Sequence, residues 1–312
     1  MIIPLDALAL LSLGLILLLA GGHYLIPGTM AIAHKMRLSP ALVATILIAG
    51  GTSAPELIVS IDAALIGRTD LIWGNIIGSN ITNIFLVLGI SALVTPILMT
   101  DKMVQRDGKI LLVLTAALIG FAVLAGALPR WASILLLIFL AYYIWQAIRK
   151  DEIPMDEAED GAALPFWKGA SYGIGGIIGL LIGADLIVDN AVIIALQAGI
   201  SEAVIGLTII AIGTSLPEIA AAVASMMRGR ADVALANVLG SNIFNIAAVM
   251  GVAGLFGSMP APAGINSFAL PVLAVATLLL SILIITKTPL NRRWGIVFIA
   301  FFVMFLAGNI SL

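Results

Sequence analysis

The sequence predicts an all-α membrane protein with ten transmembrane helices, arranged as two inverted-topology repeats of five helices. Composition, the spacing of apolar runs and an internal repeat support this fold class. Of the 312 residues, 62% are hydrophobic and 10% are charged, and the mean hydropathy is +1.18. A soluble domain carries far more charge on its surface. Cysteine is absent, which excludes disulfides and thiolate metal sites.

Apolar runs long enough to cross a bilayer recur along the whole chain, separated by glycine, proline and charged residues. A span needs roughly 20 residues, so the longer runs are expected to be tilted, kinked or broken. The first run lacks the positively charged leading segment of a signal peptide and is interpreted as a retained span. The ten predicted spans cover residues 5–27, 40–67, 71–98, 110–128, 131–148, 166–190, 202–227, 231–258, 267–286 and 294–311.

The basic residues separate onto alternate loops of this arrangement. One face holds only Arg68 and Arg130. The opposite face holds the other basic residues, which are Lys35, Arg37, Lys102, Arg106, Lys109, Arg149, Lys150, Lys168, Arg228, Arg230, Lys287, Arg292 and Arg293. Because cytoplasmic loops are enriched in lysine and arginine, we expect both termini to be extracellular or periplasmic. A prokaryotic plasma membrane is the expected location.

Two similar motifs divide the chain into halves. GTSAPELIVS begins at Gly51 and GTSLPEIAAA begins at Gly213, and the same offset aligns GNIIGSNITNIF with ANVLGSNIFNIA. The sequence therefore predicts a first five-helix repeat over 1–150, an acidic cytoplasmic linker over 151–165 and a second repeat over 166–312. Since five is an odd number, the second repeat is expected to be inverted in the membrane. Secondary transporters built this way bind substrate at the midplane, between the halves.

Each motif places a glutamate and several hydroxyl groups beside a helix break. Pro55 and Pro217 remove an amide proton and leave carbonyl groups without helical partners. Exposed carbonyls survive at membrane depth only in a protein-lined polar cavity. An acidic residue at a helix centre costs about 2.5–3.5 kcal/mol, so Glu56 and Glu218 indicate function. An all-oxygen site with two carboxylates favours hard cations such as Ca²⁺ and Na⁺.

At these residues the sequence resembles the cation/calcium exchanger superfamily, in particular the prokaryotic sodium/calcium exchangers. The resemblance covers both halves and implies that the long first and sixth helices slide across the others. It implies carboxylate ligands at Glu56 and Glu218, with Asn83 and Asn245 lining the centre. The implied hydroxyl and carbonyl ligands are Thr52, Thr214, Ser53, Ser215, Ser79, Ser241, Ala49 and Ala211. Potassium-dependent and some prokaryotic relatives have aspartate where this chain has Asn245, so no potassium requirement is expected.

The predicted function is secondary antiport of intracellular calcium for extracellular sodium, through one site that opens alternately to each side. A proton/calcium exchanger that uses the same glutamates is the alternative. An enzyme is not expected, because the only histidines, His23 and His34, lie outside both motifs; a channel is ranked equally low. We expect no cofactor and no nucleic acid, and a monomer whose partners are calcium, sodium and membrane lipid. Gly175, Gly179 and Gly183 predict close helix packing.

Overall fold

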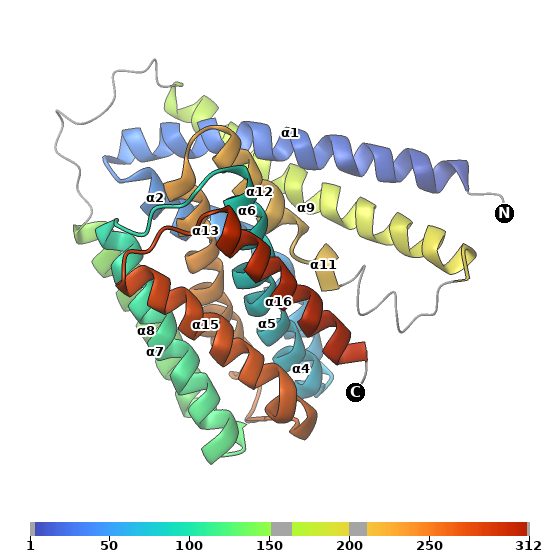
Figure 1. The fold of residues 1–312 in the computed structure, drawn as a ribbon, viewed down its shortest axis with the longest axis vertical. Coiled ribbons are helices and arrows are strands. Elements are labelled where there is room, and N and C mark those ends of the chain that lie inside the picture. The colour runs from blue at the N-terminus through green and yellow to red at the C-terminus, as the bar shows by residue number, and fades with distance from the viewer. Residues whose placement is uncertain (1–3, 151–163, 200–210, 311–312) are drawn as a thin grey trace.

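The computed structural model describes residues 4–150, 164–199 and 211–310, and these residues are predominantly helical. The predicted linker lies almost wholly outside the described residues. Two long helices, α1 (Leu5–Met36) and α9 (Phe166–Gln197), lie side by side across the remaining bundle, in which α7, α8, α15 and α16 run at a steep angle to them (Figure 1).

Both long helices extend further than the sequence analysis predicted. The expected end of α1 near residue 27 is wrong, because Pro27 is accommodated inside the helix. The helix instead ends at Met36 and is capped by Arg37, whose backbone is left-handed (φ 57°, ψ 40°) and whose N–H points to the carbonyls of Ala33 and His34. Helix α9 likewise continues to Gln197 instead of ending at residue 190.

Glycines hold α1 and α9 in close contact. A Cβ atom added at Gly28 would lie 2.8 Å from the carbonyl oxygen of Gly169, and one at Gly183 would lie 2.7 Å from that of Gly14. The prediction of close packing is confirmed for Gly179 and Gly183. It is wrong for Gly175, which faces open space. Small residues at such contacts allow two backbones to approach closely.

The two motifs form broken helices with matching bounds. The first contains α2 (Pro40–Val43), π-helical η1 (Ala44–Ile48), α3 (Ala49–Thr52) and α4 (Ala54–Leu65), with a 45° bend at the break before α4. In the second, residues 200–210 lie outside the described part, and α11 (Ala211–Gly213) precedes α12 (Leu216–Met227). Helices α4 and α12 begin and end at positions with the same offset as the motifs.

The same correspondence continues into the next pair of spans. The first consists of α5 (Thr69–Thr82), π-helical η2 (Asn83–Val87) and α6 (Leu88–Val94). The second consists of α13 (Ala231–Phe244), π-helical η5 (Asn245–Val249) and α14 (Met250–Ala253). Each of these two π-helical segments therefore begins at the third asparagine of its motif, Asn83 or Asn245. The repeat seen in the sequence is a repeat of local structure as well.

The remaining elements surround these spans. They are α7 (Lys102–Leu124), β1 (Ala127–Leu128), α8 (Arg130–Lys150), β2 (Met259–Pro260), η6 (Ile265–Ala269), α15 (Leu270–Ile285) and α16 (Arg292–Ile310). Strands β1 and β2 form one short antiparallel pair that joins the two halves. The predicted start of α7 at residue 110 is wrong. Asp101 caps the helix by accepting bonds from the N–H groups of Met103 and Val104, so the helix begins at Lys102.

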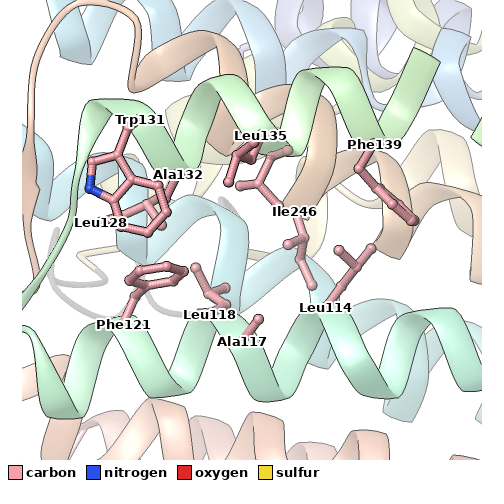
Figure 2. Close-up of a pocket in the computed structure, with 11 residues that line it drawn as sticks. Leu114, Ala117, Leu118, Phe121, Leu128, Trp131, Ala132, Leu135, Phe139 and Ile246 are labelled. Atoms are coloured by element: carbon pink, nitrogen blue, oxygen red, sulfur yellow. The ribbon is translucent and has the colours of Figure 1, made fainter. Parts of the chain in front are cut away.

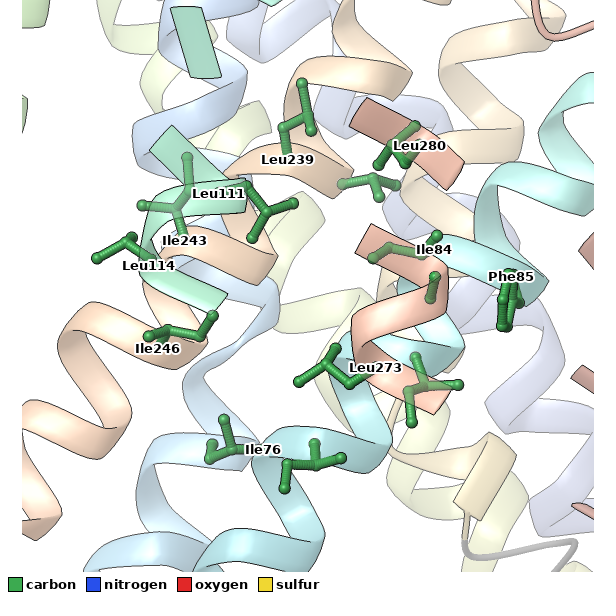
Figure 3. Packing of buried hydrophobic residues seen from close by; sticks show 14 of the residues in the cluster. Ile76, Ile84, Phe85, Leu111, Leu114, Leu239, Ile243, Ile246, Leu273 and Leu280 are labelled. Carbon is green, nitrogen blue, oxygen red and sulfur yellow. The ribbon is translucent and has the colours of Figure 1, made fainter. Parts of the chain in front are cut away.

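Within the described residues, eight helices are long and apolar enough to cross a membrane, and the bent pair over 40–65 makes a ninth. Helix α12 is a shorter apolar helix that follows undescribed residues. The most hydrophobic stretch of the span over 231–253 is 94% buried, whereas that of α8, α9 or α16 is 22% buried. Figure 3 shows the core around Ile76, Ile84, Leu239 and Leu273. The motif-bearing spans therefore form the interior, and apolar outer helices face the surroundings.

Candidate ion-binding site

The helix breaks place one glutamate from each half inside the bundle. Ser53 and Ser215 adopt similar non-helical conformations, with φ/ψ of −86°/10° and −97°/5°, and a proline follows each in the first turn of the next helix. Glu56 and Glu218 lie in the first turns of α4 and α12. A helix N-terminus stabilises a carboxylate through its unpaired N–H groups and its dipole. The local sequence thus places each carboxylate where its charge is tolerated.

Hydrogen bonds join these carboxylates to both motifs. The hydroxyl of Ser79 donates to Oε1 of Glu56 at 3.3 Å, and the hydroxyl of Ser53 donates to Oε1 of Glu218 at 3.4 Å. The second bond joins the two halves of the chain. Asn75 donates to the backbone carbonyl of Glu56 at 3.1 Å, which attaches the first turn of α4 to α5.

The two π-helical segments bring further amides to the same region. Nδ2 of Asn245 donates to Oδ1 of Asn80 at 3.2 Å, a second contact between the halves. Sequence reasoning missed Asn80 as a partner of Asn245, although Asn80 and its repeat counterpart Asn242 belong to the shared GSN motif. That shared motif was the available signal. Asn242 instead donates to the carbonyl of Val238 within its own helix.

The site residues are enclosed. Glu56 and Glu218 are 2% and 1% exposed, and Thr52, Ser53, Ser79, Asn83, Ser215, Ser241 and Asn245 are all buried. Several of their oxygen atoms have no hydrogen-bond partner within the described protein, namely Glu56 Oε2, Glu218 Oε2, Asn83 Oδ1, Asn245 Oδ1, Ser215 Oγ and Ser241 Oγ. Buried polar atoms without a partner are costly. All six atoms belong to residues that the sequence analysis selected, and oxygen atoms of this kind are the ligands that a hard cation prefers.

The backbone carbonyl of Ala49, one of the predicted ligands, already accepts hydrogen bonds within the protein. The carbonyl oxygen of Ala49 accepts hydrogen bonds from the N–H of Ser53 at 3.0 Å and from the hydroxyl of Thr52 at 3.4 Å. Coordination of a cation by this oxygen would have to replace the longer bond. Thr214 is half-buried, and Ala211 begins α11 at the edge of the described residues.

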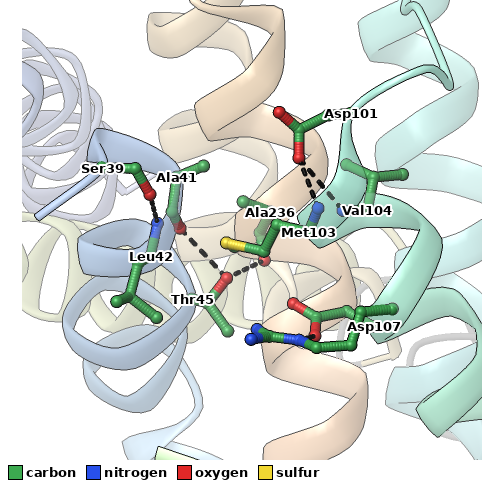
Figure 4. Close-up of polar contacts among 10 residues, drawn as sticks. Ser39, Ala41, Leu42, Thr45, Asp101, Met103, Val104, Asp107 and Ala236 are labelled. Carbon is green, nitrogen blue, oxygen red and sulfur yellow. Dashed lines mark hydrogen bonds and ion pairs between the residues drawn. The ribbon is translucent and has the colours of Figure 1, made fainter. Parts of the chain in front are cut away.

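Close backbone contact fixes the position of η1 against α13. The Thr45 hydroxyl lies 3.1 Å from the carbonyl oxygen of Ala41 and 3.3 Å from that of Ala236 (Figure 4). This one hydroxyl group therefore donates to a carbonyl in each half of the chain. A Cβ atom at Gly240 would lie 2.7 Å from the Thr45 carbonyl oxygen. Only glycine allows this approach without displacement.

A separate buried ion pair lies beside this contact. Asp107 is 0% exposed, and its Oδ1 lies 2.7 Å from Nε of Arg106 (Figure 4). The guanidinium also lies over the ring of Tyr143 in α8, 5.4 Å from the ring centre. Sequence analysis placed Arg106 in a solvated loop and did not select Asp107. The contact between Arg106 and Tyr143 therefore joins α7 to α8 in a way that the sequence pattern did not indicate.

Other ionisable residues lie apart from the site. His23 contacts Arg228, whose guanidinium donates to the His23 carbonyl at 2.8 Å. Asp62 is exposed on α4. In the described part of the chain, no group of three or more His, Cys, Asp and Glu side chains could hold a metal ion. Glu56 and Glu218 are the buried carboxylates of the two motifs.

A multi-pass helical membrane protein with a buried, carboxylate-containing oxygen cluster between two repeated motifs belongs to the class of ion transporters. A family model described as "Sodium/calcium exchanger protein" matches residues 7–149 and 168–311. The chain belongs to this sodium/calcium exchanger family, within the prokaryotic branch of the cation/calcium exchanger superfamily. The resemblance drawn from the two motifs is confirmed.

Full-length relatives agree with this assignment. The chain is 37% identical over 306 residues to the putative antiporter CaxA of Alkalimonas amylolytica, covering 93% of this chain and 94% of the relative. It is 31% identical over 341 residues to the sodium/calcium exchanger MaX1 of Methanosarcina acetivorans, covering 95% and 96%. A solved structure of the sodium-calcium exchanger NCX_Mj, soaked with Na⁺ and Sr²⁺, matches with a TM-score of 0.85 at 32% identity, over 96% of this chain and 97% of the other.

Proposed function

We propose that this protein is a secondary antiporter that exports intracellular Ca²⁺ in exchange for extracellular Na⁺ by alternating access. The carrying observation is the set of six buried oxygen atoms, two of them carboxylate oxygens, that have no hydrogen-bond partner within the described protein. A bound cation would satisfy these atoms, because Ca²⁺ takes six to eight oxygen ligands. Family membership supports cation/calcium exchange as the activity.

The proposed ligands are the residues selected from the two motifs. The carboxylates are Glu56 and Glu218; the remaining ligands are Thr52, Thr214, Ser53, Ser215, Ser79, Ser241, Asn83, Asn245, Ala49 and Ala211. Two carboxylates balance the charge of one Ca²⁺ or two Na⁺, so the two ions compete for the same oxygens. This competition couples their movements. A stoichiometry above two Na⁺ per Ca²⁺ would move net charge, at about 2.3 kcal/mol per charge per 100 mV.

Alternating access would use the repeat architecture. We propose ten transmembrane helices in two inverted five-helix repeats, over 1–150 and 166–312, joined by the cytoplasmic linker over 151–165. Glycines hold α1 and α9 in close contact with each other, and the two helices lie across the motif-bearing spans, so we propose that they move together relative to the site. The protein would act as a monomer, without a cofactor, in the plasma membrane.

Orientation can be tested at the two ends of α7. Lys102 and Ala125 are both exposed, and the native chain has no cysteine. A membrane-impermeant thiol reagent added to intact cells should label Ala125→Cys and leave Lys102→Cys unlabelled until the cells are opened. The reverse pattern would contradict the proposed orientation, in which both termini face outward.

Calcium uptake into proteoliposomes tests the choice of coupling ion. Vesicles loaded with Na⁺ and diluted into Na⁺-free medium containing Ca²⁺ should accumulate Ca²⁺, whereas vesicles with an acidic lumen and no Na⁺ should not. Protein-free vesicles and a sodium ionophore serve as controls. Uptake driven by the pH gradient alone would instead assign the unpaired carboxylate oxygens of Glu56 and Glu218 to protons and make the protein a proton/calcium exchanger.

A further inference from the structure

An apolar crevice separates α7 and α8 near the connection between them. Its volume is about 230 Å³, and α7 contributes Leu114, Leu118 and Phe121 while α8 contributes Trp131 and Leu135 (Figure 2). The lining side chains are hydrocarbon apart from the indole N–H of Trp131. Trp131 and Leu135 are 57% and 54% exposed, so the crevice opens at the outer surface of the bundle.

The apolar outer surface of α8 beside the crevice indicates what can fill the crevice. The exposed side of α8 is apolar along its length, with Ile138 59% and Ile134 42% exposed. In a membrane protein such a surface is covered by lipid hydrocarbon. A void without partner atoms forfeits dispersion contacts on its lining. A lipid acyl chain can reach this crevice from the bilayer without crossing a polar barrier.

A cationic side chain marks the end of the crevice nearest the α7–α8 connection. Arg130 is exposed and lies between two lining residues, Leu128 and Trp131. Among the described residues Arg68 is paired with Asp70 at 2.9 Å, whereas no acidic side chain lies within ion-pair distance of Arg130. A basic residue at the membrane surface attracts an anionic headgroup, and tryptophan is enriched at the same level.

We propose that the crevice between α7 and α8 binds one acyl chain of an anionic phospholipid, whose headgroup phosphate contacts Arg130. The innermost lining residue is Ile246, in η5 (Figure 2). It directly follows Asn245 of the ion site. The bound chain thus contacts the π-helical segment that carries a site residue, which distinguishes this lipid from those that only cover the surface.

Quenching of Trp131 fluorescence by brominated lipid tests the proposal. The other exposed or half-buried tryptophans, Trp145, Trp167 and Trp294, are replaced by phenylalanine, and the fully buried Trp73 is kept. The protein is placed in phosphatidylcholine vesicles that contain increasing fractions of phosphatidylglycerol brominated on its acyl chains. Quenching should indicate about fivefold enrichment of the anionic lipid over its bulk fraction, as expected for one basic residue that faces an anionic headgroup.

Paired variants distinguish lipid binding in the crevice from general contact of the protein with lipid. Ala117 is exposed and lines the crevice, whereas the neighbouring Ala116 is exposed and does not line it. With Ala117→Phe, quenching should follow the bulk fraction of brominated lipid, without enrichment. With Ala116→Phe, the enrichment of the anionic lipid should remain. Ala117→Leu provides a smaller blocking side chain if the phenylalanine variant does not fold. Arg130→Gln should reduce the enrichment, and Arg68→Gln should not.

Two results would overturn the proposal. One is quenching of the parent protein that follows the bulk lipid fraction, which would show non-selective contact. The other is enrichment that survives a folded Ala117 blocking variant, which would place the anionic lipid outside the crevice. Neither result depends on transport, so the outcome is independent of the proposed antiport activity.

Discussion

Replacement of Glu56 by glutamine tests the charge requirement of the proposed ion site. The substitution keeps the side-chain volume and one oxygen atom but removes one of the two formal charges. Glu56 is 2% exposed, and its Oε2 atom has no hydrogen-bond partner within the described protein. Water therefore cannot replace the lost charge without opening the site.

The size of the effect follows from Coulomb's law. A Ca²⁺ ion about 3 Å from a carboxylate charge gains about 11 kcal/mol at an effective dielectric constant of about 20. Desolvation of the ion and of the carboxylate costs several kcal/mol each. If desolvation cancels about two thirds of the gain, about 3.5 kcal/mol remains, equivalent to a roughly 300-fold loss of calcium affinity.

Sodium-driven calcium uptake in proteoliposomes is the assay, measured at calcium concentrations below saturation. Glu56→Gln should reduce uptake to about 1% or less of the parent rate, in proportion to the lost affinity, and Glu218→Gln should behave in the same way. Asp62→Asn is the matched control, because it makes the same chemical change on the exposed side of the same helix. Its uptake should match that of the parent. Near-parental uptake by monodisperse Glu56→Gln would refute the shared-carboxylate site.

Three further predictions follow from the structure. Because Asn245 adds no formal charge, a K⁺ ion bound beside Ca²⁺ would place three positive charges against two carboxylates. Calcium uptake should therefore be unchanged when an inert organic cation replaces potassium at clamped potential. Loss of calcium uptake without potassium would contradict this reasoning. Asp107→Asn removes the buried carboxylate from its ion pair with the partly exposed Arg106, so the free energy of unfolding should fall by about 1.5–3 kcal/mol. Asp101→Asn, which keeps a helix cap, should alter thermal unfolding little. Equal effects of these two variants would show that the buried pair has no special role. Gly28→Leu should lower the midpoint temperature of thermal unfolding, because the leucine side chain would overlap α9. Gly175→Leu should leave this midpoint unchanged, since position 175 faces open space. Equal midpoints for the two variants would contradict the close contact of α1 with α9 at Gly28.

The amino-acid sequence by itself determined the membrane class and the internal repeat, and it supplied the residues of the proposed site. Apolar runs of bilayer length indicate membrane-spanning segments, because the free energy of transferring each residue from water into the bilayer depends mainly on its own side chain. The paired GTS and GSN motifs identified Glu56 and Glu218 because a carboxylate within an apolar helix is costly wherever the chain folds. Pro55 and Pro217, each two residues after a motif serine, also predicted the helix breaks, because those breaks depend on local backbone chemistry.

Only the tertiary structure decided which groups meet across the halves. The bonds from Ser53 to Glu218 and from Asn245 to Asn80 join residues 165 positions apart, and no periodicity within either segment indicates such partners. The continuation of α1 through Pro27 was also decided by context, because the glycine-lined contact with α9 continues beyond that proline at Gly28. The contact between Arg106 and Tyr143 and the apolar crevice beside Ile246 arise from the packing of α7 against α8. Long-range contacts depend on the relative placement of whole helices, and a single sequence carries that information only through the complete fold.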